Sequence, residues 1–159
     1  EELMGIPDFE TPDYSELFAE EKELIVKLKK AFLMVAGSAV QKYGTDLDQH
    51  QQLLMAASDM LIEIYMAESG ILRPEKLVKN IGEANAKEQI AMAKLYLYQA
   101  VDIIYTKGKE GIVSFAQEDE QRMMLMGLRR FTKYNNQPNV IELKETIASK
   151  VIADNKYSF

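Results

Sequence analysis

The stretch EKELIVKLKKAFLMVAGSAVQKYG, residues 21–44, shows the pattern that decides the fold. Its apolar side chains recur at steps of three and four residues, which is the spacing of one face of an α-helix. These positions are Leu24, Leu28, Phe32, Val35, Ala36, Ala39, Val40 and Tyr43. A helix is therefore predicted from about residue 16 to Tyr43, with Ser15 as its N-cap and Gly44 as its stop.

The same period continues beyond this stretch and predicts further helices at about 46–80, with its start at Asp46 or Asp48, and at 83–115, 119–134 and 139–154. The helix over 46–80 carries Leu53, Leu54, Ala57, Met60, Leu61, Ile64, Tyr65 and Leu72. Pro74 is expected to kink this helix without ending it, because Gly70, four residues earlier, eases the clash with the preceding turn.

Two local signals concern the later helices. Gly108 and Gly111 each disfavour a helix by ~1 kcal/mol relative to alanine, so fraying or a bend is expected there. Asn139 and Glu142 are spaced as in a capping box, which marks the start of the last helix.

Three long helices with short connections must pack antiparallel, and the two shorter C-terminal helices together are expected to supply a return leg. The predicted fold class is all-α, an up-and-down helical bundle over residues 16–159. Residues 1–15, which hold Pro7 and Pro12 among acidic residues, are predicted to be a linker or an extended arm.

The composition excludes several functions. The 159 residues carry a net charge of −6, which argues against nucleic acid and anionic lipid as partners. The absence of cysteine excludes disulfides, thiol catalysis and cysteine-ligated metals, and it favours a reducing, cytoplasmic location. The longest apolar run, residues 31–40, is half of the ~20 residues that span a bilayer.

No catalytic residue and no metal ligand is predicted. The single histidine, His50, lies among polar neighbours and is therefore expected to be an exposed helical residue. A di-iron bundle site is excluded, because it needs two Glu-x-x-His motifs. The segment KGKEG, residues 107–111, lacks the spacing of a phosphate-binding loop and a preceding strand.

Three carboxylates of the helix over 46–80 are candidates for a catalytic role. Asp59 and Glu63 lie four residues apart, with Glu68 further along, and two carboxylates on one face could form a general acid/base pair. The alternative is that they face solvent or pair with arginines of another helix. If they face inward, Arg122 and Arg129 are the candidates to neutralise them.

Two segments, AFLMVA at 31–36 and MMLMGL at 123–128, are apolar on all sides of the predicted helix; the second lies within RMMLMGLRRF at 122–131. A surface helix of a small isolated bundle keeps a polar stripe, so such segments predict either a crowded core or contact with a second protein body. Methionine suits such contacts because it is flexible and polarizable. The predicted interface residues are Met34, Met123, Met124, Met126, Arg129, Arg130 and Phe131.

Several longer stretches carry a resemblance to a known family. They are EKELIVKLKKAFLMVAGSAVQKYG (21–44), LLMAASDMLIEIYMAESGILR (53–73), SFAQEDEQRMMLMGLRRFTK (114–133) and IADNKYSF (152–159). Together they resemble the C-terminal helical accessory domain of acyl-CoA dehydrogenases of the very-long-chain type, particularly the bacterial forms. The likeness covers about residues 16–159 in order and rests on overall pattern rather than on a chemical signature.

The resemblance implies a parent enzyme whose FAD-containing catalytic unit removes two hydrogens from the α and β carbons of an acyl-CoA thioester. It implies that this chain packs against that unit or mediates assembly, for which a homo-oligomer is one form, and that it holds no catalytic or FAD-binding residue. The family's membrane-attachment region would correspond to residues 1–15, but these are acidic and broken by proline, which puts membrane association in doubt.

Two other functions remain open from the sequence. One is a free-standing helical protein-interaction module that binds a partner at the methionine-rich surface. The other is a carrier of acyl chains that uses Met34, Met60 and Met123 between its helices.

Overall fold

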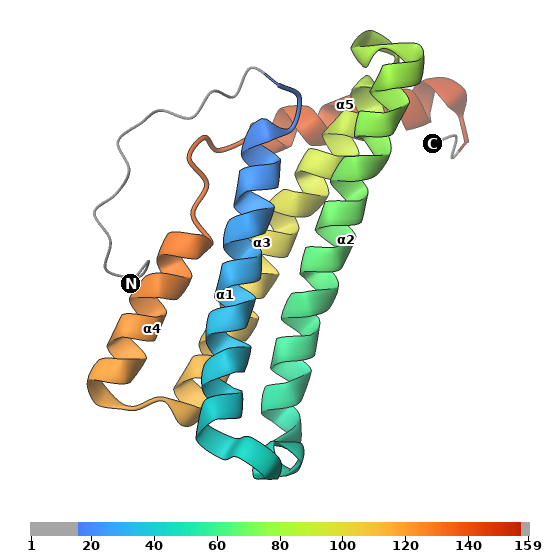
Figure 1. Ribbon diagram of the computed structural model, residues 1–159. Coiled ribbons are helices and arrows are strands. Elements are labelled where there is room, and N and C mark those ends of the chain that lie inside the picture. The colour runs from blue at the N-terminus through green and yellow to red at the C-terminus, as the bar shows by residue number, and fades with distance from the viewer. Residues whose placement is uncertain (1–15, 157–159) are drawn as a thin grey trace.

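A computed structural model describes residues 16–156 of the chain and confirms the all-α class (Figure 1). The helices are α1 (Ala19–Tyr43), α2 (Gln51–Ile81), α3 (Lys87–Phe115), α4 (Glu118–Phe131) and α5 (Val140–Asp154). Two 3₁₀ turns, η1 (Gly44–Gln49) and η2 (Glu83–Asn85), connect the first three. No strand occurs within residues 16–156. The predicted arm over 1–15 and the predicted N-cap Ser15 lie outside the described residues.

The long helices begin later than the sequence predicted. The second helix was expected from about residue 46, but Gly44–Gln49 form the turn η1 and α2 starts at Gln51. The third was expected from Glu83, but Glu83–Asn85 form the turn η2. Gly44 and Gly82 have positive φ angles of 53° and 80°, which are strained for residues with a side chain, and both end a helix, Gly44 as predicted.

Helices α1, α2, α3 and α4 form an antiparallel bundle (Figure 1). Helix α2 packs on α1 and α3 on one side, and α4 packs on the same two helices from the other side. Fully buried side chains fill the space between them, including Leu28, Met60, Leu97, Ile104 and Leu128. Burying one such side chain contributes ~1.5–3 kcal/mol, so this shared core holds the four helices together.

Helix α3 runs unbroken through Gly108 and Gly111, so the expected fraying is not seen. Both glycines are buried at contacts between helices. A Cβ at Gly111 would lie 3.1 Å from Val35 Cγ1 of α1 and 3.4 Å from Leu53 Cδ1 of α2. The missing side chains let neighbouring helices approach closely, and the packing gained outweighs the low helix propensity of glycine.

Helix α2 continues past Pro74 to Ile81, as predicted. Its apolar residues divide into two sides. Leu53, Met60, Ile64, Ala67 and Ile71 are buried in the core, whereas Leu54, Leu61, Tyr65 and Leu72 are exposed. The period of three and four residues therefore reflects two apolar stripes on one helix.

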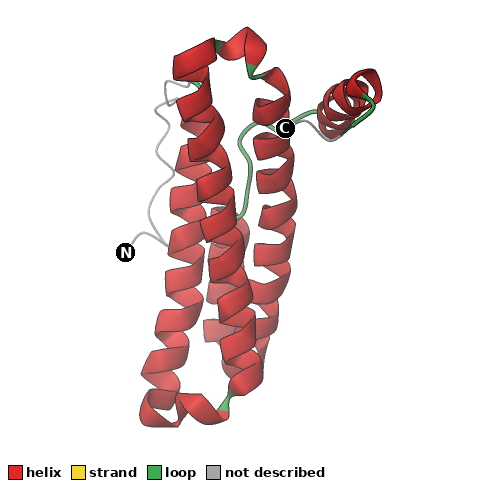
Figure 2. Ribbon diagram, turned by 90° about the vertical axis from the view of Figure 1, so that its right-hand side faces the viewer, coloured by secondary structure: helices red, strands yellow, loops and turns green. Residues whose placement is uncertain are grey.

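The C-terminal end departs from the predicted return leg. Helix α4 ends at Phe131, before the predicted end at Tyr134, and it alone closes the bundle. Helix α5 crosses one end of the bundle and contacts α3 without any buried residue of its own (Figure 2). The predicted cap is present, because Asn139 Oδ1 accepts a hydrogen bond of 3.3 Å from the Glu142 N–H.

Candidate functional site

The predicted interface residues of α4 fall on two different sides of that helix. Met124 and Phe131 are buried at 6% and 9% exposure and pack into the core. Met123 and Met126 are 50% and 66% exposed, and Arg129 and Arg130 are exposed beside them. The helix is thus amphipathic, with an exposed surface that ends in two arginines.

The apolar segment of α1 divides in the same way. Met34 is half-buried and packs against the core, while its neighbour Leu33 is 65% exposed. Val26 and Val40, one heptad before and after Leu33, are also exposed, at 51% and 53%. The outward side of α1 therefore carries a line of aliphatic side chains that does not include Met34.

The three carboxylates of α2 each bind a different partner. The Asp59 carboxylate lies 3.4 Å from Lys107 Nζ, and the Glu68 carboxylate lies 2.6 Å from Lys29 Nζ. Glu63 accepts a hydrogen bond of 2.8 Å from the Tyr96 hydroxyl. These partners, rather than arginines, bind the carboxylates, and each of the three carboxylates is engaged with a different side chain of a neighbouring helix.

These contacts tie α2 to its neighbours. Burial, and then the hydrogen bond to the Glu63 carboxylate, raises the pKa of Tyr96 to about 12. The phenol therefore stays protonated and donates to Glu63 at neutral pH. Lys107, part of the KGKEG segment, lies in the middle of α3 and also pairs with Glu110 at 3.2 Å, so the segment is helical and forms no phosphate loop.

The arginines of α4 do not reach the α2 carboxylates. Arg122 pairs with Asp119 of its own helix at 3.3 Å, and both side chains are highly exposed. Arg129 Nε donates to the Tyr105 hydroxyl of α3 at 3.4 Å. The predicted neutralising role of Arg122 and Arg129 is therefore wrong.

His50 lies at the junction between η1 and α2, half-buried rather than exposed as predicted. Its ring stacks on Tyr43 with centroids 3.6 Å apart. No group of three potential ligands for a metal ion occurs among residues 16–156.

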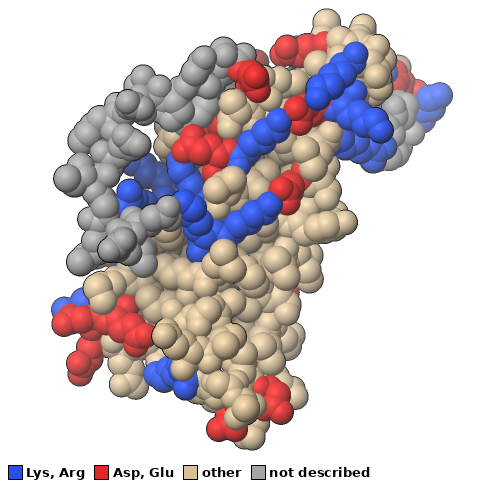
Figure 3. All heavy atoms as spheres, in the orientation of Figure 1, with Lys and Arg blue, Asp and Glu red and all other residues tan. Residues whose placement is uncertain are grey.

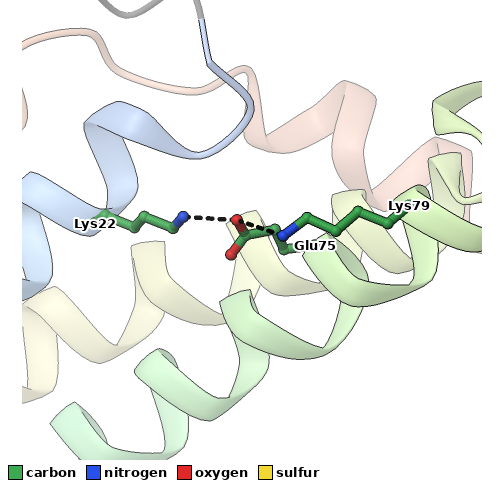
Figure 4. Close-up of polar contacts among 3 residues, drawn as sticks. All are labelled: Lys22, Glu75 and Lys79. Carbon is green, nitrogen blue, oxygen red and sulfur yellow. Dashed lines mark hydrogen bonds and ion pairs between the residues drawn. The ribbon is translucent and has the colours of Figure 1, made fainter.

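An ion-pair cluster joins the starting turns of α1 to the last turns of α2. Lys22 Nζ lies 2.8 Å from Glu75 Oε1, and Lys79 Nζ lies 3.8 Å from the same oxygen (Figure 4). The hydrogen bond from Lys22 and the nearby charges hold the pKa of Glu75 below its usual range, against the effect of burial. The cluster fixes the register of α1 on α2 and offers no unpaired acid.

The outstanding surface feature was not singled out from the sequence. Seven large apolar residues lie exposed on the side of α2 that faces away from the bundle, and we call this set the α2 outer face. They are Leu54, Met55, Leu61, Ile62, Tyr65, Met66 and Leu72, with exposures between 38% and 67%. The signal that could have found them is the second apolar stripe at heptad spacing, Leu54, Leu61 and Leu72 with Tyr65 between them.

A groove adjoins this face between α2 and α3. It measures about 660 Å³, and Met66 and Arg73 of α2 line it together with Met92 and Tyr96 of α3. Gln89 also lines it, and its buried Oε1 accepts no hydrogen bond from any described residue. Met60, proposed above as part of an acyl-chain cavity, is instead fully buried in the core, where its Cε lies 3.3 Å from the position of a Cβ on Gly108.

Within residues 16–156, no helix has the length and apolar character that crossing a membrane requires. The described residues thus define a class of protein, an antiparallel four-helix bundle with paired charges and apolar outward surfaces. The family model described as "Acyl-CoA dehydrogenase, C-terminal domain" matches residues 27–130, which include most of α1 and extend into α4. The chain therefore belongs to the family of acyl-CoA dehydrogenase C-terminal domains.

Two similar proteins agree with this assignment. A probable acyl-CoA dehydrogenase of Bacillus subtilis (strain 168) is 32% identical over 144 residues, covering 91% of this chain and 24% of the relative. A crystal structure of an acyl-CoA dehydrogenase complexed with FAD from Bacillus anthracis superposes with a TM-score of 0.86 at 36% identity. The superposition covers 91% of this chain and 25% of the Bacillus anthracis chain. This chain therefore spans about a quarter of the length of both dehydrogenases.

Proposed function

We propose that this chain is the C-terminal accessory domain of a FAD-dependent acyl-CoA dehydrogenase and packs against the catalytic domains of that enzyme. The observation that carries the proposal is the family membership, combined with coverage of only about a quarter of each similar dehydrogenase. In this proposal the parent enzyme oxidises an acyl-CoA thioester between its α and β carbons, in the cytoplasm, and this chain supplies contact surface.

The structure supports a role without a cofactor of its own. A flavin dinucleotide needs donors for its pyrophosphate, commonly a glycine-rich turn that opens a helix. Helices α2 and α3 open directly after His50 and Ala86, and α4 opens with Glu118, Asp119 and Glu120, whose charges repel phosphate. The starts of α2, α3 and α4 therefore offer no glycine-rich turn for the pyrophosphate of FAD, and the proposal assigns flavin and acyl-CoA to the rest of the parent polypeptide.

The exposed apolar surfaces support a packing role. Soluble monomers rarely expose contiguous apolar patches larger than a few hundred Å², and larger ones mark interaction sites. The exposed residues of the predicted set, Met123, Met126, Arg129 and Arg130, remain proposed contacts with the catalytic domains or with another copy of the chain. Met34, Met124 and Phe131 support that surface from the core side of α1 and α4.

A comparison of two purified proteins tests the proposal. The full-length polypeptide that contains this chain is expected to be yellow with stoichiometric FAD and to reduce a dye with acyl-CoA. The 159-residue chain alone is expected to be colourless and inactive. Stoichiometric flavin or turnover in the short chain, or a colourless and inactive full-length polypeptide, would contradict the proposal.

The gene sequence upstream of residue 1 distinguishes this proposal from the alternative, a free-standing interaction module. A dehydrogenase-like reading frame that continues in frame into residue 1 supports the accessory domain, whereas a start codon within a few residues upstream supports the free-standing module.

A further inference from the structure

The α2 outer face has the length and regularity of a helix-packing surface. Leu54, Leu61, Tyr65 and Leu72 follow one another at steps of seven, four and seven residues. This spacing keeps side chains on one line along a helix, as in helices that pack lengthwise on each other. Leu54 and Leu72 are eighteen residues apart, which at 1.5 Å per residue is about 27 Å. A partner helix of five turns would be covered along its whole length.

The exposed side of α1 extends this surface sideways. The ion pairs Lys22–Glu75 and Lys29–Glu68 are spaced two turns apart on both helices and set an antiparallel register. In that register Val26 lies level with Leu72, and Leu33 lies level with Tyr65. Two adjacent helices, each about 10 Å wide, then present a patch on the order of 500 Å², the upper range for a monomer.

Charges are distributed unevenly over this side of the molecule. Figure 3 shows lysine, arginine and acidic side chains gathered over the upper half of α1 and α2, with a broad uncharged area below them. The acidic residues along α2, Asp59, Glu63 and Glu68, are already bonded within the bundle. A partner of the lower area is therefore selected by apolar contact rather than by charge.

The upper end of the face is different. Arg73 and Lys76 are exposed there, and neither makes an ion pair or hydrogen bond with a described residue. Both line the 660 Å³ groove between α2 and α3. A partner that is acidic at this end would complement these two cations.

The length of the similar dehydrogenases indicates the occupant. About three quarters of each lies outside the part that this chain matches, and in the proposed parent that remainder is joined to this domain by the same backbone. A tethered partner has an effective concentration of roughly millimolar, which favours it over a second, freely diffusing copy.

Building on the proposed function, we propose that the α2 outer face, with Val26, Leu33 and Val40 of α1, docks the catalytic part of the same polypeptide. The docked element is an amphipathic helix, apolar along its length and acidic where it passes Arg73 and Lys76. The α4 surface lies on the opposite side of the bundle and does not take part in this contact.

Thiol labelling of the full-length polypeptide tests this docking face, and the absence of cysteine from this chain makes a single introduced thiol readable by peptide mass spectrometry. Tyr65→Cys places the thiol at a position that is 67% exposed in the bundle. The matched control, Ile152→Cys, lies on α5 and is 78% exposed. Each maleimide labelling rate is measured on native protein and divided by the rate in urea.

Docking predicts that Tyr65→Cys labels at least about tenfold more slowly than Ile152→Cys, at every protein concentration. Equal rates at the two positions would overturn the inference. Protection that disappears on dilution would also overturn it, since it would assign the face to a second copy. Flavin content and acyl-CoA oxidation of the same samples report the proposed function separately, because a yellow, active enzyme with an unprotected Tyr65→Cys contradicts only the docking face.

Discussion

Gly108 of α3 lies directly against Leu128 of α4, so that a Cβ on Gly108 would be 2.8 Å from Leu128 Cδ1. This contact is where α4 closes the bundle, and Met60 Cε of α2 lies 3.3 Å from the same Cβ position. Three helices thus meet at one residue without a side chain.

Gly108→Ala is expected to destabilise the chain by about 1 kcal/mol, because overpacking costs ~1–3 kcal/mol and exceeds the ~1 kcal/mol of helix propensity that alanine gains. Leu128 is 0% exposed, so its side chain is enclosed by its neighbours. Urea unfolding midpoints measure the effect. The control is Gly37→Ala on the exposed side of α1, where nothing lies within 4 Å, and it is expected to stabilise by ~0.5–1 kcal/mol. Equal effects of the two substitutions would contradict this packing.

The contact between Lys22 and Glu75 predicts a dependence of stability on acid. The pKa of Glu75 is lowered in the folded chain, mainly by its hydrogen bond with Lys22. Its contribution is therefore present above the unfolded pKa and is lost as the pH falls through the folded pKa. Glu75→Gln is expected to lower stability by less than about 1 kcal/mol at pH 7, since the pair is partly exposed, and to have no effect at pH 2.5. A difference from the unsubstituted chain that persists at pH 2.5 in urea unfolding would exclude an ionic origin.

The raised pKa of the Tyr96 hydroxyl predicts that the stability of the chain depends on pH in the alkaline range. Its pKa is about 12 in the folded chain, above the unfolded value near 10, so its contribution is complete below about pH 10 and is lost as the pH rises toward 12. Tyr96→Phe is expected to cost about 1 kcal/mol at pH 8 and less at pH 11, by urea unfolding. The exposed residue Tyr65 supplies the control Tyr65→Phe, for which the same loss at both pH values or none is expected.

The exposed cations at the groove predict an electrostatic contribution to docking. In the full-length polypeptide that carries Tyr65→Cys, adding Arg73→Glu and Lys76→Glu is expected to increase labelling severalfold, because two repulsions replace two attractions at the acidic end of the partner. Lys144→Glu on the exposed side of α5 is the matched control and is expected to change nothing. An unchanged labelling rate with Arg73→Glu and Lys76→Glu would show that the docked element is not acidic there.

The sequence predicted which segments are helical because helical periodicity is a local property, and the cap at Asn139 and the passage of α2 through Pro74 depend on neighbours within one turn. It did not predict the role of Gly108, because the close approach of Leu128 depends on how α4 packs on α3. The propensity of glycine gave the opposite expectation.

The candidate surface was predicted only in part, for a related reason. A helix with two apolar stripes gives the same three- and four-residue spacing whichever stripe enters the core, so Leu54 and Leu61 could not be told from Leu53 and Met60. On α4, the apolar run predicted either a crowded core or contact with a second protein body, and in the fold Met124 is buried while Met123 and Met126 are exposed. Which apolar residues face outward is decided by the packing of all four helices.

The most direct measurement of the central claim is co-elution of two separately encoded pieces. This chain and the preceding part of its parent polypeptide are expressed together as two polypeptides and separated by size-exclusion chromatography, with flavin absorbance followed at 450 nm. This chain is expected to elute in a one-to-one complex with a yellow partner. Elution of this chain alone, as a colourless protein separate from a flavin-loaded partner, would contradict it.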